Sequence, residues 1–552
     1  MKNEICISTD PREGKKNMTP AVVDALERLK DAKNATLSFA PGVYHFYEEG
    51  CVEKYFAVSN NSAGMKKIIF PIFDREGLTI DGQGAVFVFH GVVFPFLIHG
   101  CKNIVLKNIM IDREFSPVAL LTVHNKTEEG FQLLVDKTKS PFHIEKGGVV
   151  FEREGFVRST LERKIALHGI DRWGVQYIFA GDCPDRKENL PAPHLLTDAT
   201  EIEGGFQLTY RPDSPFRCQF AEGERVMSLL DGERFVDVIL LDDSEEILVK
   251  NITVRRGLGM GVIGQRSKNI EIDGFSTDIE YYNEHSTLTA DSMHFINCEG
   301  NLEVHNCHIS HTMDDIINVH GIYTALENAE DDALFVALRH YEQFGFNPYK
   351  PGDRLELIHP QNLEVLGEFL VETSEFLDDG QKLKLRGAFR WGRDKVSPGC
   401  LVENPDRMPD VHLHHNHFAV YPHLRLSGGG EILVEDNVME CGMAALLGLD
   451  LAKYWYESGR IRHLVYRNNI FRNCNALGGN SFLTIGVDGF AEKETPEIHD
   501  TVEITGNVFE ELKEFAIVAS GVKHLRWRDN AFRTDKKDIV RINGAVEYLS
   551  GE

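Results

Sequence analysis

Three aspartates lie close together in the middle of the chain: Asp291, and then the adjacent pair Asp314 and Asp315. Two short runs of alternating apolar and polar residues separate them, broken by Glu299-Gly300, which is typical of a strand, a turn and a second strand. A chain that repeats itself at such a period coils, so that a residue one period later stacks over its predecessor, about 4.8 Å away. We therefore expect Asp291 and Asp314 on adjacent coils.

The chemistry that these carboxylates suggest is acid–base catalysis. Carboxylates at this separation repel each other, so folding alone does not favour them, and like charges push pKa values apart, as a general acid and a general base require. The flanking side chains of His294, Asn318 and His320 are polar and could hold sugar hydroxyls. The simpler alternative is a turn in which aspartates hydrogen-bond local backbone. The third aspartate, one coil away, favours the catalytic interpretation.

A repeated phrase predicts the elements that must position these residues. It pairs an alternating apolar run with an Asn or Gly at a bend, and it occurs in the segments 77–84, 103–115, 247–254, 269–278, 301–309, 432–439, 463–471, 502–509 and 524–532. The spacing stays near 23 residues or exceeds it by a loop length, as in a solenoid with loops on one face. We predict a parallel β-helix from about residue 35 to about residue 535, with the alternating apolar side chains inside and Asn side chains bonding the turns. A short amphipathic helix at 19–31 should cover its open end.

Two segments interrupt the repeat with alternating runs and turn signals, and we expect each to be a small antiparallel β-barrel or sandwich module. The predicted organisation is a cap helix and first coils in 1–115, an inserted module in 116–245, central coils with the aspartates in 246–321, a second module in 322–411, and C-terminal coils in 412–552. Both modules adjoin the aspartate stretch, so they could form walls of its site.

Two further motifs could bind ligands. A loop contains three adjacent aromatic residues, Tyr454, Trp455 and Tyr456, followed by Glu457. The rings could stack on a sugar and the acid could bind its hydroxyls. Equally, the rings could simply provide apolar cover for a long loop. The His-rich stretch 411–417 could hold a metal, but successive residues of a strand alternate faces, and we favour a strand with solvent-facing imidazoles. We predict no metal site and no cofactor.

Composition excludes several classes of partner. A net charge of −26 argues against nucleic acid and anionic membranes, but not against a neutral sugar. Ten cysteines in 552 residues do not form a disulfide framework, and we interpret several of them as small apolar residues inside the coils. The N-terminus has no apolar signal segment, so we expect a cytoplasmic protein, or an exported one whose signal has been removed. A homodimer is an open alternative to a monomer.

The residues also resemble a known family. The runs ADSMHFINC, NCHI and DDIINVHGIY, together with APGVYHF, GMGVIGQ and YWYESG, resemble glycoside hydrolase family 110, the α-1,3-galactosidases that remove terminal galactose from blood group B structures. The resemblance covers nearly the whole chain. It implies a right-handed parallel β-helix with barrel-like insertions. Ser292, Ile316 and Ile317 depart from the smaller residues expected beside the acids.

The resemblance also implies roles for the acids. Asp314 would be the general acid, and Asp291 and Asp315 would activate water, with inversion at the anomeric carbon and without a metal. More distant β-helix polygalacturonases also use three aspartates, but they bind an acidic polymer. The stretch from Asp291 to Gly321 holds no Lys or Arg, which favours a neutral sugar.

Two other functions remain open from the sequence. One is a β-helix protein that binds glycans without catalysis, for which aromatic and amide side chains would be more typical than stacked acids. The other is a lyase or uronate-active hydrolase on the same fold, for which a base of high pKa or calcium held by several acids would be expected.

Overall fold

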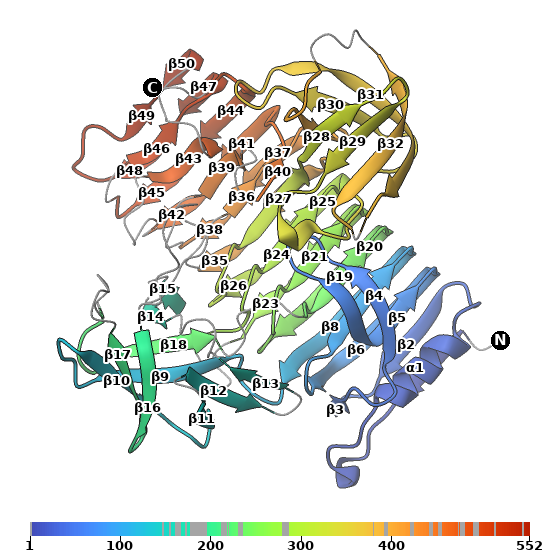
Figure 1. The fold of residues 1–552 in the computed structure, drawn as a ribbon, viewed down its shortest axis with the longest axis vertical. Helices are drawn as coiled ribbons and strands as arrows, with labels where there is room; N and C mark the ends of the chain where they lie inside the picture. Colours follow the sequence, from blue (N-terminus) through green and yellow to red (C-terminus); the bar gives the residue numbers. More distant parts are fainter. Residues whose placement is uncertain are drawn as a thin grey trace.

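The computed structural model describes most of the chain. It covers residues 3–551 apart from 146–147, 154–155, 160–166, 172–173, 177–195, 211–217, 219, 230–235, 279–285, 379, 391–395, 420–423, 441–444, 451–454, 473, 475–480, 489–495, 513–514 and 544–545. The described residues form a long solenoid of strands with two projecting modules (Figure 1). The predicted parallel β-helix with inserted antiparallel modules is confirmed.

Two large sheets, whose strands pair in parallel along the solenoid, form its walls. The first contains β2 (Ala35–Phe39), β6 (Glu76–Phe89), β8 (Lys102–Arg113), β20 (Glu245–Val254), β22 (Lys268–Asp273), β25 (Glu299–His305), β34 (Asp410–His414), β37 (Glu431–Glu435), β41 (His463–Arg467), β44 (His499–Thr505), β47 (Val522–Arg528) and β50 (Val546–Gly551). The second contains β5 (Ala63–Phe73), β7 (Phe94–His99), β19 (Ile239–Asp242), β21 (Val262–Gln265), β24 (Met293–Ile296), β27 (Ile317–Ile322), β36 (Leu424–Leu426), β39 (Ala445–Asp450), β43 (Ser481–Asp488), β46 (Phe515–Ala519) and β49 (Val540–Ile542).

The pairing register agrees with the repeat read from the sequence. Ile247 lies beside Ile270 and Ile270 beside Leu302, which gives coils of 23 and 32 residues. A bend with a left-handed residue divides each coil of the first sheet, as at Asn251 and Asn306, whose φ angles are 50° and 55°. Asn tolerates this conformation better than most residues, which explains its recurrence at the bends.

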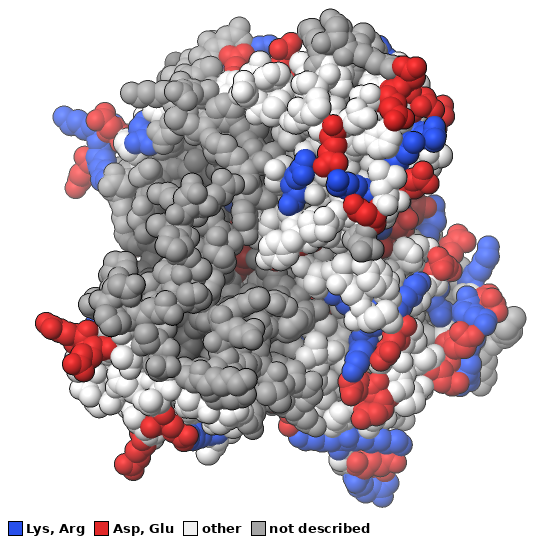
Figure 2. Space-filling view, in the orientation of Figure 1, with Lys and Arg blue, Asp and Glu red and all other residues white. Residues whose placement is uncertain are grey.

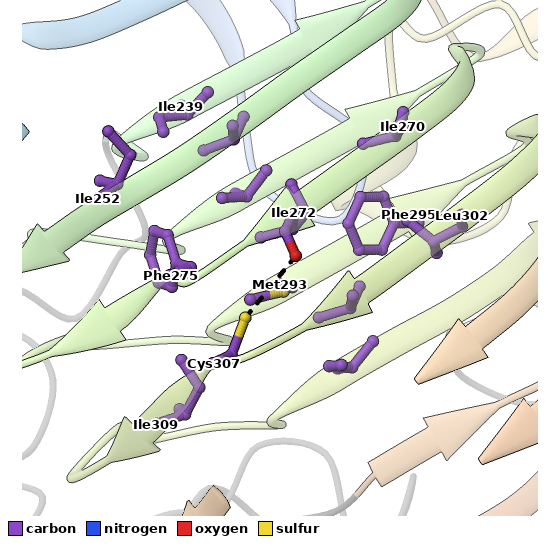
Figure 3. Packing of buried hydrophobic residues seen from close by; sticks show 14 of the residues in the cluster. Ile239, Ile252, Ile270, Ile272, Phe275, Met293, Phe295, Leu302, Cys307 and Ile309 are labelled. Atoms are coloured by element: carbon purple, nitrogen blue, oxygen red, sulfur yellow. Dashed lines mark hydrogen bonds between the residues drawn. The ribbon is translucent and has the colours of Figure 1, made fainter. Parts of the chain in front are cut away.

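The interior is a continuous column of apolar side chains. Ile272, Phe275, Met293, Phe295 and their neighbours are fully buried between the two sheets (Figure 3). The side chain of Cys307 points into the same interior, where its Sγ lies 3.9 Å from the carbonyl oxygen of Ile272. Cys101, Cys298 and Cys474 are also buried free thiols, so their interpretation as small apolar residues is confirmed, while Cys441 lies outside the described residues.

The N-terminal part closes one end of this column. Helix α1 (Thr19–Arg28) buries Val22, Ala25 and Leu26 in the main apolar cluster. The helix predicted at 19–31 is therefore present, and it ends three residues earlier than expected. β4 (Val52–Ala57) and β5 form an antiparallel hairpin beside the first coils.

The two inserted modules are antiparallel. The first has one sheet of β9 (Val118–His124), β10 (Gly130–Val135), β14 (Leu167–Asp171), β15 (Gly174–Gln176), β16 (Leu196–Ile202), β17 (Gly205–Tyr210) and β18 (Arg225–Leu229), and another of β11 (Phe142–Glu145), β12 (Gly148–Arg153) and β13 (Phe156–Ser159). The second is a closed barrel of β28 (Thr324–Ala329), β29 (Ala333–Ala337), β30 (Arg354–Ile358), β31 (Val365–Phe376), β32 (Lys382–Phe389) and β33 (Leu401–Glu403). The barrel leaves the solenoid directly after β27, so it begins beside the aspartate stretch (Figure 1).

Candidate active site

Three predicted site residues lie on neighbouring strands of adjacent coils, His294 on β24 and Asn318 and His320 on β27 (Figure 1). Asp291 lies just before β24, and Asp314 and Asp315 lie just before β27. Met293 lies beside Ile317 and His294 beside Asn318, which is a register of 24 residues. The backbone N–H of Ser292 donates to the carbonyl oxygen of Asp315 at 2.9 Å. Asp291 is therefore level with Asp315 and not with Asp314. The expected pairing of Asp291 with Asp314 is wrong by one residue, because β25 begins with a bulge that adds one residue to this coil: Lys268 lies beside Glu299, whereas Ile270 lies beside Leu302.

Residues 311–316 form a bend that contains the two adjacent acids. Successive residues of a regular strand point to opposite faces, so both acids can serve one site only where the strand is interrupted. The Asp314 side chain is partly exposed and its Oδ1 accepts a hydrogen bond from the backbone N–H of Asp315 at 3.1 Å. Asp315 is buried, with only 6% of its surface exposed. The two acids therefore have different environments, which is the condition for different pKa values and different roles.

Two histidines connect Asp291 to the far end of β27. Nδ1 of His294 lies 2.6 Å from Oδ2 of Asp291, and Nε2 of His294 lies 2.7 Å from Nε2 of His320. Nδ1 of His320 lies 2.6 Å from the carbonyl oxygen of Gly321. All three side chains are buried. Burial lowers the pKa of His320 to about 4 despite the opposing effect of nearby Glu457.

The loop that contains Glu457 returns to this point as β40 (Glu457–Ser458), which pairs antiparallel with the end of β27. Gly321 lies beside Ser458 in this pairing. A Cβ atom on Gly321 would lie 2.3 Å from Cε of Met408 and 2.5 Å from Oγ of Ser458. A side chain at this position would therefore have to displace the end of Met408 and the hydroxyl of Ser458, which pack directly against Gly321.

Glu457 is buried among polar partners from distant parts of the chain. Its Oε1 accepts hydrogen bonds from Nδ2 of Asn60 at 3.1 Å and from Nδ2 of Asn318 at 3.3 Å. Nη2 of Arg425 lies 3.8 Å from Oε2 of Glu457, and Nε of Arg425 lies 3.9 Å from Oδ2 of Asp315. Burial alone would raise the pKa of Glu457, but His320 and Arg425 hold it below the usual value.

The aromatic part of the loop is described only in part. Trp455 lies against His340, with ring centroids 4.4 Å apart, and its carbonyl oxygen accepts a hydrogen bond from Nε2 of Gln343. Tyr454 lies outside the described residues. Stacking of a sugar on Trp455 therefore stays a prediction.

Sequence reasoning missed two residues of this cluster, Asn60 and Arg425. Asn60 lies at the tip of the hairpin between β4 and β5, 397 residues from Glu457. Arg425 lies beside Asn318 on β36, one coil beyond the aspartates. Neither belongs to a motif, so only the stacking of coils could reveal them. The site also contains a cation that the stretch from Asp291 to Gly321 lacks, which weakens the sequence argument for a neutral sugar.

Among the described residues, four groups of side chains have the composition of a metal site, and two of them contain residues singled out from the sequence. In the first, ligand-type atoms of His294, His320 and Glu457 lie within 4.8 Å of one another. Two nitrogen ligands of one tetrahedral zinc stand roughly 3.3 Å apart, given Zn–N bonds of about 2.0–2.1 Å. The 2.7 Å between the two Nε2 atoms is shorter and fits a direct hydrogen bond.

The second group, Glu303, His412 and His414, lies on the outer face of the first sheet. His412 and His414 are two residues apart on β34 and therefore share this face, as the alternation of a strand requires, with ring centroids 4.2 Å apart. Nε2 of His412 lies 3.0 Å from Glu435 and Nε2 of His414 lies 3.1 Å from Glu303. The predicted strand is confirmed, and these contacts are those of cross-strand pairs.

The chain is similar over nearly its whole length to curated enzymes. It is 28% identical over 548 residues to α-1,3-galactosidase B of Bacteroides thetaiotaomicron, covering 94% of this chain and 84% of that protein. It is 26% identical over 529 residues to α-1,3-galactosidase A of Shewanella woodyi, covering 93% and 82%. The resemblance to the α-1,3-galactosidases is confirmed. No protein-family model matches the chain.

The solved structures to which this chain is similar are more distant from it in sequence. The chain is similar to a family 28 exopolygalacturonase of Yersinia enterocolitica, at 12% identity and a TM-score of 0.42, over 99% of this chain and 78% of that one. It is also similar to a polygalacturonase of Erwinia carotovora, at 10% identity and a TM-score of 0.40, over 98% and 96%. In the described part of this α-1,3-galactosidase relative, no helix is long and apolar enough to cross a membrane.

Proposed function

We propose that this chain is an exo-acting glycoside hydrolase that releases terminal α-1,3-linked galactose from glycans such as the blood group B antigen. The observation that carries the proposal is the level pairing of Asp291 with Asp315, with Asp314 at the adjoining bend, in a chain similar to α-1,3-galactosidases. Three carboxylates at one point are unfavourable for folding and useful for acid–base catalysis.

The proposed reaction is a single displacement. Asp314, the most exposed of the three acids, gives its proton to the glycosidic oxygen as the bond to the anomeric carbon breaks. A water attacks that carbon from the opposite face and loses its proton to the carboxylates of Asp291 and Asp315, so the first product is β-galactose. Asn318, Glu457 and the aromatic loop with Tyr454 and Trp455 would bind the sugar. His294 and His320, whose ring nitrogens contact Asp291, each other and the carbonyl oxygen of Gly321, would orient the acid instead.

The test is an NMR time course with an α-1,3-galactosyl disaccharide. We expect the β-anomer of free galactose to appear before mutarotation produces the α-anomer. Release of α-galactose first would contradict inversion, and absence of any galactose would contradict the function. A chelator should change neither result.

A uronate-active hydrolase is the second candidate, because Arg425 places a cation beside Asp315 and Glu457, where an acidic sugar would need one. Polygalacturonate and galacturonide disaccharides belong in the same panel. Cleavage of these and not of the galactoside would establish the second candidate, and binding without cleavage would indicate a glycan-binding protein. The five-segment organisation, the homodimer and the cytoplasmic or exported location remain predictions.

A further inference from the structure

The hydrogen bonds of the two buried histidines fix where their protons lie. A backbone carbonyl oxygen only accepts hydrogen bonds, so Nδ1 of His320, 2.6 Å from the carbonyl of Gly321, must hold a proton. Nε2 of His320 then holds a second proton only if the ring is charged. Burial keeps His320 neutral near neutral pH, because its pKa is lowered to about 4. Nε2 of His320 is therefore an acceptor.

The proton between the two rings must then belong to His294. A contact of 2.7 Å between the two Nε2 atoms requires one proton, and it lies on Nε2 of His294. The other ring nitrogen of His294, Nδ1, is 2.6 Å from Oδ2 of Asp291, and this short contact requires a proton as well. Whether that second proton lies nearer the nitrogen or the oxygen, the Asp291–His294 pair holds one proton more than a free carboxylate and a neutral imidazole.

The surroundings favour this extra proton. Two negative groups lie near the pair and favour an extra proton on it: Asp315, level with Asp291, and Glu457 on β40. The positive charge of Arg425 on β36 disfavours that proton. His320 on β27 is neutral and has no such effect. An ionised Asp291 beside a neutral His294 would add a further buried negative charge to Asp315 and Glu457. Sharing a proton makes the pair neutral and removes that repulsion.

We propose that His294 is a positioning residue that keeps a proton on the Asp291–His294 pair, so that Asp315 is the carboxylate that takes the proton from the attacking water. The proposal rests on the proposed hydrolase function and divides the roles of its two water-activating acids. The water oxygen bonds to the anomeric carbon, its proton moves to Asp315, and the glycosidic oxygen leaves with the proton of Asp314. Asp291 holds the water by a hydrogen bond and gains no net proton.

The direct test needs no substrate. In protein labelled with ¹⁵N-histidine, one- and two-bond ¹H–¹⁵N correlations at pH 7 should show His320 protonated only at Nδ1 and His294 protonated at Nε2. A proton on Nε2 of His320, or an unprotonated Nε2 in His294, would overturn the proposal. Because the measurement reports on the free protein, its outcome does not depend on whether galactose is the correct substrate.

A metal bridge between the rings would also overturn the proposal. Elemental analysis of the purified protein, before and after dialysis against a chelator, should find no stoichiometric transition metal. Its presence, with loss from a His294→Gln variant, would assign the contact to an ion.

The kinetic test uses His294→Gln, which keeps hydrogen-bonding atoms but cannot carry the extra proton. Asp291 is then ionised next to Asp315 and raises the pKa of the base. We expect the acidic limb of the kcat/KM profile to move up by about one pH unit. A limb that stays in place would contradict the proposal, since a merely structural role lowers activity without moving the limb.

The matched control is His499→Gln. His499 is also buried and hydrogen-bonded, to the carbonyl oxygen of Gly486 and the N–H of Ile461, but it lies on another coil outside the site. His499→Gln should leave the acidic limb of the kcat/KM profile unchanged. The division of roles further predicts that Asp315→Asn loses at least about tenfold more activity than Asp291→Asn; equal losses, or a larger loss for Asp291→Asn, would contradict it.

Discussion

Stacking coils bring like polar groups together in two columns of this solenoid, with opposite results. In the C-terminal half, Asn416, Asn437, Asn469, Asn507 and Asn530 form a ladder in which each Nδ2 donates to Oδ1 of the next asparagine at 3.0 Å. Each Nδ2 also donates to a carbonyl oxygen of the preceding coil, as from Asn469 to Val434 at 2.8 Å. The second column contains Asp291 and Asp315.

The difference lies in what each group can offer a copy of itself. An amide has both donors and an acceptor, so a stack of amides satisfies its own hydrogen bonds. An ionised carboxylate has only acceptors, so stacked acids need protons or cations from elsewhere. The protein supplies them as His294, three residues along the chain from its partner acid, and as Arg425, from the next coil. A stack of polar side chains that cannot satisfy its own hydrogen bonds is therefore a candidate functional site.

The largest effect is expected at Asp314, the more exposed acid beside the column of Asp291 and Asp315. Asp314→Asn should lower kcat/KM on an α-1,3-galactosyl disaccharide by about 10³-fold, and much less on aryl galactosides whose leaving groups need no protonation. Rates on a series of aryl galactosides with different leaving-group pKa values measure this. The thermal melt should match that of the parent protein. Equal losses on all substrates would contradict the role of Asp314 as the acid.

The next largest effect is a loss of stability when the asparagine ladder is broken. Asn469→Ala should lower the free energy of unfolding by about 3 kcal/mol, because it leaves buried donors and acceptors of two neighbouring asparagines unsatisfied. Urea unfolding measures the loss, and kcat/KM should stay within twofold of the parent value. Asn468→Gly is the matched control: its residue lies at the adjoining bend with φ of 57°, where glycine fits, so stability should hardly change.

A third prediction concerns a buried acid that lies in the inserted barrel, outside both columns. Glu403 in the barrel is buried, and burial raises its pKa to about 7 although Arg460 opposes this. Its folded pKa lies above the unfolded value of about 4.3, so it stabilises the fold at low pH and this contribution is lost as the pH rises to 7. Glu403→Gln removes the titration. Relative to the parent, this variant should gain up to about 2 kcal/mol between pH 5 and pH 7.

Parallel urea titrations of the parent protein and Glu403→Gln across that pH range measure the gain. A constant difference between the two proteins would show that Glu403 is already ionised at pH 5. Asp410→Asn, at an exposed residue on β34, serves as the control for a lost surface charge.

The smallest expected effect concerns the exposed histidine column. His412 and Glu435 pair on the outer face of the first sheet, with 39% and 15% of their side chains exposed. On the face shown in Figure 2, Lys and Arg lie close to Asp and Glu over the described surface. His412→Gln should change stability by at most about 0.5 kcal/mol and leave activity unchanged, because exposed pairs contribute little. A large loss that excess zinc reverses would instead indicate a metal on this face.

The sequence by itself determined the solenoid, because apolar alternation and a left-handed bend residue are local properties that every coil must repeat. It also placed Asp291, Asp314 and Asp315 near one another, since that needs only an approximate period. It could not determine which acids are level, because one extra residue at a bulge in β25 shifts the register of β27, while the apolar alternation continues on either side of the bulge. The contacts of Asn60, Arg425 and Glu457 were decided only by the tertiary structure. They join segments up to 397 residues apart, and the loops between them set which coil each one reaches.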